Sequence, residues 1–228
     1  MRTVVVTGGT KGIGKAIVER FEAAGDQVIG VGRATCDVTD EEQVNQLFQT
    51  VGPVDVLVNN AGIAQGAPVA RTTLDAWREH LAVNATGAFL CTRAVLDGMI
   101  ERGDGRIVTV ASTAGLRGAR YTAAYTAAKH AAVGLMRAVA AETAGTGVTS
   151  NAVCPGWVRT EMMRRAVERI AATTDRDEEQ AEATLVAQMP LGRALEAEEV
   201  AFAVAFLASP EAAAINGQAL VLDGGGIQ

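Results

Sequence analysis

Short apolar runs alternate with longer amphipathic stretches along the chain. Six of these runs are rich in β-branched residues and predict buried strands, at residues 3–7, 27–31, 53–58, 106–111, 148–153 and 217–222. The amphipathic stretches predict helices at residues 12–24, 40–50, 74–102, 122–144 and 196–208. Strands that alternate with helices in this way predict an α/β fold, in which helices cover both faces of a Rossmann-type, doubly wound parallel sheet.

The length and composition of the chain limit what kind of protein it encodes. Its 228 residues, of which 49% are hydrophobic and 20% charged, fit one globular domain that spans residues 1–228. A net charge of −6 disfavours nucleic acid as a partner. No apolar run reaches the roughly 18 residues that span a bilayer, and no signal peptide precedes the first strand, so we expect no membrane anchor.

The three cysteines, Cys36, Cys91 and Cys154, are widely spaced and odd in number. Together with only two histidines, they predict neither a disulfide framework nor a metal site. We therefore expect a reducing, cytoplasmic location. We interpret Cys154 as a small buried apolar residue rather than as a nucleophile.

A glycine-rich turn joins the first predicted strand to the first predicted helix. Residues 8–14 read Gly-Gly-Thr-Lys-Gly-Ile-Gly, with Gly8, Gly12 and Gly14 at its key positions. Glycines allow close backbone approach, and the amides and dipole of a helix amino terminus attract phosphate, so the turn predicts a dinucleotide site. The spacing differs from the commoner Gly-x-Gly-x-x-Gly fingerprint, and a glycine turn without a ligand is the alternative.

The end of the second strand indicates which dinucleotide is used. In NAD-binding domains an acidic residue at this point bonds to the 2′-hydroxyl of the adenosine ribose. This chain has Arg33 there instead, and Lys11 stands within the glycine turn. Two cations suit a 2′-phosphate, so NADP is favoured over NAD. The alternative is that both are ordinary surface cations.

Ser112, Tyr125 and Lys129 form a candidate acid–base group. Tyr125 and Lys129 are four residues apart in a predicted helix, so they lie one turn apart on the same face. A phenol has a pKa of about 10, and a neighbouring ammonium is expected to lower it. Ser112 ends a predicted strand, where ligands bind in such sheets, so its hydroxyl suits polarising a carbonyl. The alternative is that Tyr125 and Lys129 share a solvated face.

These motifs, in this order, resemble those of the short-chain dehydrogenase/reductase family over essentially the whole chain. The resemblance implies that Tyr125 is the proton donor and that Ser112 binds the carbonyl. It implies that Lys129 lowers the pKa of Tyr125 and holds the nicotinamide ribose. It also implies that Asn84 orders a proton-relay water, whereas Asn84 by itself suggests a capping or buried amide.

The resemblance extends the cofactor site along the ends of several strands. Small residues at 59–62 would let the backbone lie against the adenosine half, although a plain turn uses the same residues. A Pro-Gly bend within residues 154–160 is implied to hold the nicotinamide carboxamide. The full set of implied cofactor contacts is Gly8, Thr10, Lys11, Gly12, Ile13, Gly14, Arg33, Asp37, Val38, Asn60, Ala61, Gly62, Tyr125, Lys129, Pro155, Gly156, Val158 and Thr160.

The segment between the second strand and residue 40 departs from the family pattern. Only a few residues separate Val31 from Asp37, whereas a parallel crossover needs roughly a dozen. The third strand of the family is therefore expected to be missing, which leaves six strands in the order 2-1-4-5-6-7 by the family's numbering. The helix at residues 40–50 is expected to help cover the exposed edge of the second strand.

Two further regions bear on substrate and assembly. Residues 157–190 predict a helical lid over the substrate, with helices near 161–171 and 177–188. The helices at 74–102 and 122–144 are rich in Ala and Gly, and in members of the family such helices form a subunit seam. A homodimer or homotetramer is therefore implied, and packing within one subunit is the alternative.

The resemblance implies an oxidoreductase that transfers hydride reversibly between NADPH and a ketone. Residues 52–62, 151–156 and 189–193 are most similar to 3-oxoacyl thioester reductases, including polyketide ketoreductases. The partner is then a small-molecule or carrier-bound ketone. The alternatives are a dehydrogenase of a small hydroxy acid or of a cyclic or secondary alcohol, and a redox-sensing regulator that binds dinucleotide without turnover.

Four arginines suggest how an anionic carrier could be attracted. Arg117 and Arg120 follow Ser112, and Arg164 and Arg165 lie on the first predicted lid helix. If they meet at the cleft mouth, they form a basic rim. The alternative is that Arg164 and Arg165 only solvate the lid helix.

Overall fold

The computed structural model describes residues 1–227. Within this part, six parallel strands form one sheet in the order β2-β1-β3-β4-β5-β6. The strands are β1 Thr3–Thr7, β2 Gln27–Val31, β3 Val56–Asn59, β4 Gly105–Val110, β5 Val148–Pro155 and β6 Ala219–Leu222. The predicted fold class, strand number and strand order are confirmed.

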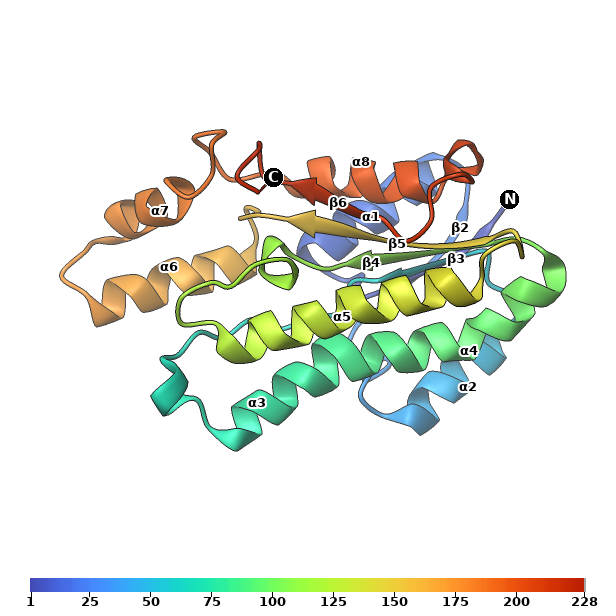
Figure 1. Cartoon of the computed structure of the whole chain (residues 1–228), viewed down its shortest axis with the longest axis horizontal. Coiled ribbons are helices and arrows are strands. Elements are labelled where there is room, and N and C mark those ends of the chain that lie inside the picture. The colour runs from blue at the N-terminus through green and yellow to red at the C-terminus, as the bar shows by residue number, and fades with distance from the viewer. Residues whose placement is uncertain (228) are drawn as a thin grey trace.

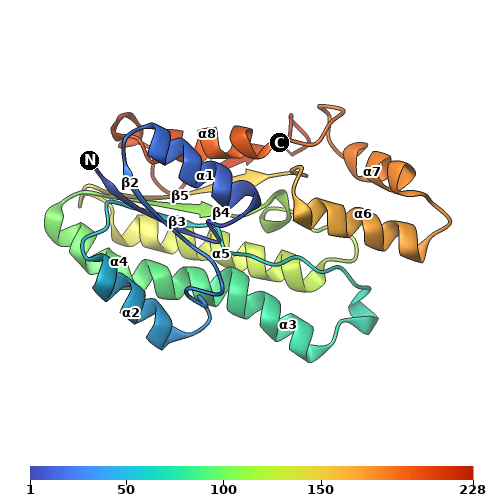
Figure 2. The same ribbon diagram turned by 180° about the vertical axis from the view of Figure 1, so that it is seen from behind.

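Helices cover both faces of the sheet (Figures 1 and 2). One face carries α1 Gly12–Ala23 and α8 Ala197–Leu207, which pack against each other. The other face carries α2 Glu41–Val51, α4 Gly87–Arg102 and α5 Ala123–Glu142. The helix α3 Leu74–Leu81 precedes α4, and short 3₁₀ turns occupy Val69–Arg71, Thr113–Gly115 and Pro210–Ala212.

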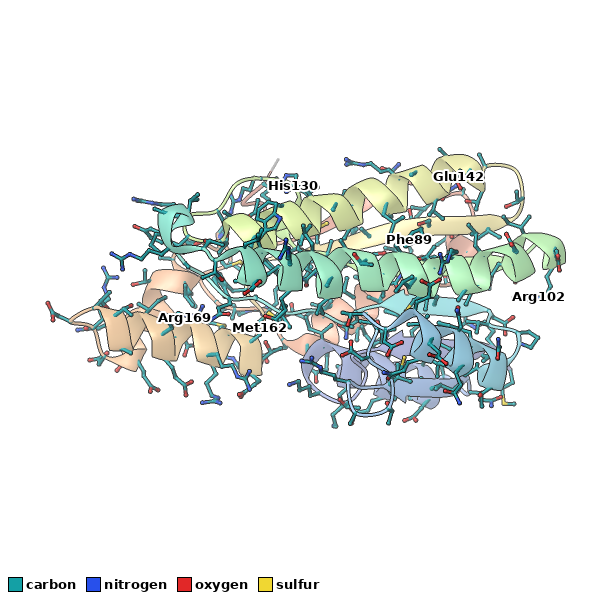
Figure 3. All side chains as sticks on the ribbon, turned by 90° about the horizontal axis from the view of Figure 1, so that it is seen from below. Phe89, Arg102, His130, Glu142, Met162 and Arg169 are labelled. Atoms are coloured by element: carbon teal, nitrogen blue, oxygen red, sulfur yellow. The ribbon has the colours of Figure 1, made fainter. Side chains whose placement is uncertain are left out.

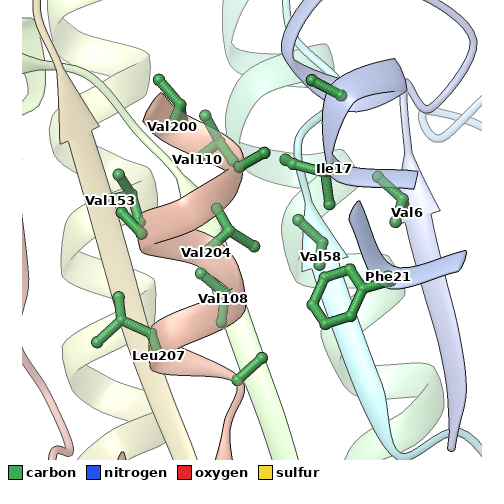
Figure 4. Packing of buried hydrophobic residues seen from close by; sticks show 14 of the residues in the cluster. Val6, Ile17, Phe21, Val58, Val108, Val110, Val153, Val200, Val204 and Leu207 are labelled. Atoms are coloured by element: carbon green, nitrogen blue, oxygen red, sulfur yellow. The ribbon is translucent and has the colours of Figure 1, made fainter. Parts of the chain in front are cut away.

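The two faces have separate apolar cores because successive strand residues point to opposite sides. In β1, Val4 and Val6 join the cluster under α1 and α8, whereas Val5 joins the cluster under α2, α4 and α5. Figure 4 shows the first cluster, in which Ile17 and Phe21 of α1 face strand valines. This packing fixes α1, and with it the glycine turn, at the carboxyl end of β1.

The segment from Gly32 to Asp40 contains no strand, as predicted. It forms two tight turns, in which Gly32 O accepts from Cys36 N at 2.9 Å and Asp37 O accepts from Asp40 N at 3.0 Å. The helix α2 begins directly after Asp40, whose carboxylate accepts from the amides of Glu42 and Gln43. It packs against α4, while β2 keeps exposed residues, so the expected cover of the β2 edge is partial.

The predicted helix at residues 74–102 is interrupted. A π-helical turn, Ala82–Thr86, joins α3 to α4 and contains Asn84. Such turns carry one extra residue and are frequent at functional sites. The amphipathic period alone did not reveal this turn.

Two further helices, α6 Glu161–Thr173 and α7 Glu178–Val186, extend past the carboxyl ends of the strands (Figure 1). Met163 and Val167 of α6 share a small apolar cluster with Ala181 and Leu185 of α7. The α6–α7 segment therefore has a core of its own. No helix among the described residues is long and apolar enough to cross a membrane.

Candidate active site

The predicted site residues gather at the carboxyl ends of neighbouring parallel strands. The glycine turn follows β1, residues 60–62 follow β3, Ser112 follows β4 and residues 156–160 follow β5. Because these strands are adjacent, the four segments lie side by side at one edge of the sheet. Within residues 1–227, no group of three or more His, Cys, Asp or Glu side chains is arranged to hold a metal ion.

The amino terminus of α1 is open to an anion. Its capping residue, Lys11, makes no side-chain cap, and the first turn contains no acidic residue. Gly12 has a φ of 53°, and a Cβ built on it would lie 3.4 Å from Thr160 Cγ2. The turn therefore faces the segment after β5, and its free amides fit the pyrophosphate of a dinucleotide.

Residues 60 and 61 are bonded to the end of β1, and Asn60 is also bonded to the glycine turn. The amides of Asn60 and Ala61 each donate to Thr7 Oγ1 at 3.0 Å. The side-chain amide of Asn60 donates to the carbonyls of Thr7 at 2.9 Å and Gly8 at 3.1 Å. Asn60, which follows β3, therefore ties the end of that strand to the end of β1. Thr7 was not among the predicted site residues. Its position as the last residue of the first strand could have indicated that it lies at the site.

The predicted adenosine end is formed by the turns after β2. Arg33 Nε donates to Asp37 Oδ2 at 3.2 Å. The amide and hydroxyl of Thr39 donate to the other oxygen of Asp37, and these bonds, with Arg33, hold the pKa of that carboxyl below its ordinary value. A Cβ on Gly32 would lie 2.9 Å from the side chain of Thr10. Arg33 and Thr10 therefore flank the same turn, whereas Lys11 is exposed directly before α1.

Val38 is buried against α4. The side chain is 7% exposed, and a Cβ on Gly87 of α4 would lie 2.7 Å from Val38 Cγ2. Its packing on α4 holds the turn before α2 against the body of the domain.

Asn84 is buried and holds the chain that follows β3. Its Oδ1 accepts from Ile63 N at 3.2 Å, and its Nδ2 donates to Ile63 O at 3.1 Å and to His80 O at 3.0 Å. A Cβ on Gly62 would lie 2.8 Å from Asn84 Oδ1 and 3.6 Å from Lys129 Nζ. The structure therefore brings Gly62, Asn84 and Lys129 together.

The Ser112 hydroxyl lies beside the phenol of Tyr125. Burial raises the pKa of the Tyr125 phenol, and the nearby Ser112 hydroxyl opposes part of that rise. Ser112 also accepts from the amide of Ala114 at 3.1 Å, which fixes its hydroxyl at the start of a 3₁₀ turn.

Lys129 lies one turn beyond Tyr125 on α5. Its ammonium donates to Val110 O at 2.9 Å and lies 5.8 Å from the centroid of the Tyr125 ring. Burial lowers the pKa of Lys129 to about 8.

In the chain by itself the pKa of Tyr125 is raised, so the expected net lowering is wrong there. Both groups are desolvated, which favours the neutral form of each: the pKa of Tyr125 rises and that of Lys129 falls to about 8. The ammonium is directed at the Val110 carbonyl rather than at the phenol oxygen. The helical spacing could not reveal this burial.

The segment after β5 is held from both sides. Gly156 N donates to Leu222 O at 2.8 Å, and Val158 pairs with Leu195 in an isolated bridge. Thr160 Oγ1 donates to Val158 O at 3.2 Å. Cys154 is fully buried, and burial raises the pKa of its thiol to about 11, which disfavours a nucleophilic thiolate.

The two α6 arginines of the predicted basic rim are paired with acids on their own helix. Arg164 and Arg165 both pair with Glu161, at 2.6 Å and 3.0 Å, and Arg164 also pairs with Glu168. These pairs neutralise the two arginines on their own helix, as the alternative interpretation required. Arg117 donates to Gly226 O at 3.2 Å and carries no such pair among the described residues.

His80 is a residue of this region that sequence reasoning missed. It is 1% exposed on α3, and its Nε2 lies 3.0 Å from Gln65 N. Nothing in the local sequence pattern indicates this contact, because Gln65 lies in an irregular segment.

Comparison with known proteins points to oxidoreductases. A family model described as enoyl-(acyl carrier protein) reductase matches residues 27–226. A putative ketoacyl reductase of Streptomyces coelicolor is 39% identical, covering 97% of this chain and 95% of that protein. The 3-oxoacyl-[acyl-carrier-protein] reductase FabG of Vibrio cholerae is 37% identical, covering 98% and 96%.

The fold comparison agrees with these relatives. A crystal structure of a variant actinorhodin polyketide ketoreductase with NADPH has a TM-score of 0.89 at 37% identity. The similarity covers 98% of this chain and 96% of that one. The resemblance therefore extends across the whole fold, including the ends of the strands where the site lies.

Proposed function

Because the chain belongs to the short-chain dehydrogenase/reductase family of oxidoreductases, we propose that it reduces the ketone of a 3-oxoacyl thioester with NADPH. The observation that carries the proposal is the placement of Ser112, Tyr125 and a buried Lys129 together at the strand ends, where Lys129 is bonded to Val110 O. Relatives named as ketoacyl reductases over nearly their full length support the substrate class.

The chain's own residues supply orientation and a proton in this reaction. When bound, the dinucleotide supplies the hydride for the carbonyl carbon. Ser112 and Tyr125 donate hydrogen bonds to the carbonyl oxygen, and Tyr125 gives that oxygen its proton. The raised pKa of Tyr125 keeps the phenol protonated at neutral pH, as a proton donor requires. The Lys129 ammonium and Ser112 then stabilise the phenolate that remains.

Asn84 would order the path by which the phenolate is reprotonated. Its amide is already fixed by Ile63 and His80, so its position beside Gly62 and Lys129 is rigid. Such preorganisation avoids rearrangement during the chemical step.

The cradle of small residues fits a dinucleotide. Gly8, Gly12, Gly14 and the amide of Ile13 would approach the pyrophosphate at the uncapped start of α1. Arg33, Thr10 and Lys11 would bind the 2′-phosphate, which favours NADP over NAD. The remaining assigned contacts are Asp37, Val38, Asn60, Ala61, Gly62, Lys129, Pro155, Gly156, Val158 and Thr160.

Substrate would enter under the α6–α7 segment, which we assign as a lid within residues 157–190. Arg117 and Arg120 are the arginines left to attract an anionic carrier, because Arg164 and Arg165 are paired with acids on α6. The three cysteines are buried and unpaired, which suits a reducing compartment such as the cytoplasm.

A homodimer or homotetramer would use the outer face of α4 and α5 (Figure 3). Phe89 of α4 is 42% exposed on this face, and Gly134 of α5 is exposed, so a second copy could approach closely.

A turnover assay that compares NADPH with NADH tests the proposed function. NADPH and NADH consumption would be followed with a 3-oxoacyl thioester, small ketones and, in reverse, small alcohols and hydroxy acids. We expect the highest kcat/KM for the thioester with NADPH. A clear preference for a hydroxy acid or cyclic alcohol with NAD would overturn the substrate assignment, and no turnover with any of them would favour a dinucleotide sensor.

A further inference from the structure

His80 is held in one protonation state by two backbone groups. Its Nδ1 lies 2.7 Å from Ala76 O, and its Nε2 lies 3.0 Å from Gln65 N. A carbonyl oxygen only accepts, so Nδ1 carries the hydrogen; a backbone amide only donates, so Nε2 carries none. The imidazole is therefore neutral, with its acceptor nitrogen aimed across to a different segment.

The segment that His80 holds is the one that Asn84 holds. Asn84 binds both backbone groups of Ile63, and His80 binds the amide of Gln65, two residues further along. The two side chains come from one helical segment, four residues apart. They are also joined to each other, because Asn84 Nδ2 donates to His80 O at 3.0 Å.

This clamped segment, residues 63–65, continues directly from Gly62. A Cβ on Gly62 would lie 2.8 Å from Asn84 Oδ1 and 3.6 Å from Lys129 Nζ, so there is little space for movement. If the Gln65 bond is lost, Asn84 alone must hold residues 63–65. Any shift of these residues changes the place of Asn84 relative to Lys129.

We propose that His80 is a positioning residue for the proposed reduction: its neutral Nδ1–H tautomer holds the Gln65 amide and so keeps residues 63–65 and Asn84 in place beside Lys129. This inference rests on the proposed function for its kinetic consequence, but the clamp itself is a structural claim. His80 touches none of the groups assigned to substrate or dinucleotide, so it acts through Gln65 and Asn84.

A cavity beside His80 makes the claim testable by substitution. Its volume is about 160 Å³, and Gln65, Arg71, Tyr121 and Ala124 are among its lining residues. A side chain of changed shape at position 80 therefore has room without displacing the helix.

Two substitutions that place an amide side chain at position 80 separate the effects of the two imidazole hydrogen bonds. In His80→Gln the terminal amide reaches the place of Nε2 and can accept from Gln65 N. In His80→Asn the shorter amide reaches only the place of Nδ1 and can donate to Ala76 O.

The chain's other histidine gives a matched control. His130 is exposed on α5 and makes the same bond to a carbonyl four residues earlier, Thr126 O at 2.9 Å.

The experiment compares His80→Gln, His80→Asn and His130→Asn with the unmodified protein. We expect His80→Asn to lower kcat about tenfold, as for loss of one buried hydrogen bond, while the Kd for NADPH changes by less than about threefold. His80→Gln should restore most of kcat, and His130→Asn should resemble the unmodified protein. Equal losses in His80→Gln and His80→Asn would overturn the proposal.

Amide hydrogen exchange provides a readout that does not need turnover. Peptides that contain Gln65 should exchange faster in His80→Asn than in His80→Gln or the unmodified protein. Unchanged exchange in His80→Asn would show that His80 does not hold this segment. If the unmodified protein turned over no substrate, the proposed function would fail, and exchange alone would decide whether the clamp exists.

Discussion

The ammonium of Lys129 donates a hydrogen bond to the backbone carbonyl of Val110 at 2.9 Å, and the side chain is 5% exposed. Val110 is the last residue of β4, two residues before Ser112. The bond therefore fixes the active-site helix to the strand that carries Ser112. It also holds a charged group where water cannot solvate it, which has a consequence for stability.

Replacing Lys129 by Met should stabilise the dinucleotide-free protein at neutral pH and abolish turnover. Burial lowers the pKa of Lys129 from 10.5 to about 8, so between these values the unfolded chain binds more protons than the folded one. Below pH 8 the buried ammonium costs up to about 3 kcal/mol, and the cost disappears as pH rises through the unfolded pKa.

Urea unfolding of both proteins at pH 7 and pH 9.5 would measure this effect. The stability advantage of Lys129→Met should be larger at pH 7. An advantage that is the same at both pH values would show that Lys129 does not titrate in this way.

Replacing Tyr125 by Phe should leave NADPH binding nearly intact and lower kcat by about 10²–10⁴-fold, because a positioned proton donor contributes that much. Tyr121→Phe is the control, since Tyr121 is 58% exposed and lies against Arg120. Turnover by Tyr125→Phe near that of the unmodified protein at neutral pH would refute the proposed donor.

The number of strands was predictable because residue counting is a strong constraint, whereas their order followed from the family resemblance. The few residues between Val31 and Asp37 exclude a crossover, and the structure shows two turns there. The ion pairs of Glu161 with Arg164 and Arg165 were also available from their spacing of three and four residues. The basic-rim hypothesis overlooked that signal.

Other features depend on contacts that spacing does not encode. The π-helical turn at Ala82–Thr86 accompanies the bonds of Asn84 to His80 and Ile63, and Ile63 is distant in sequence. The raised pKa of Tyr125 follows from burial, which a helical period cannot specify. For the same reason His80 drew no attention from its sequence position.

Replacing Arg33 by Asp should reverse the preference for NADPH over NADH. A charge-assisted contact of Arg33 with the 2′-phosphate is worth roughly 1.5–3 kcal/mol, or about 10–100-fold in kcat/KM. The ratio of kcat/KM for the two dinucleotides measures the effect. Arg20→Asp is the control, because Arg20 lies over Phe202 on α8 and away from the strand ends. An unchanged ratio in Arg33→Asp would remove Arg33 from the cofactor site.

Replacing Gly62 by Ala should lower both stability and turnover, because the new methyl group has no room. It would lie 2.8 Å from Asn84 Oδ1, which cannot move away while Asn84 is bonded to Ile63 and His80. Overpacking of this kind costs typically 1–3 kcal/mol, and here the displaced group is the amide proposed to order the proton relay. Gly118→Ala is the control, since a Cβ at Gly118 meets no atom within 4 Å. Thermal unfolding and kcat would be measured for both variants. A Gly62→Ala protein as stable and as active as Gly118→Ala would show that Gly62, Asn84 and Lys129 are not packed as tightly as their geometry indicates.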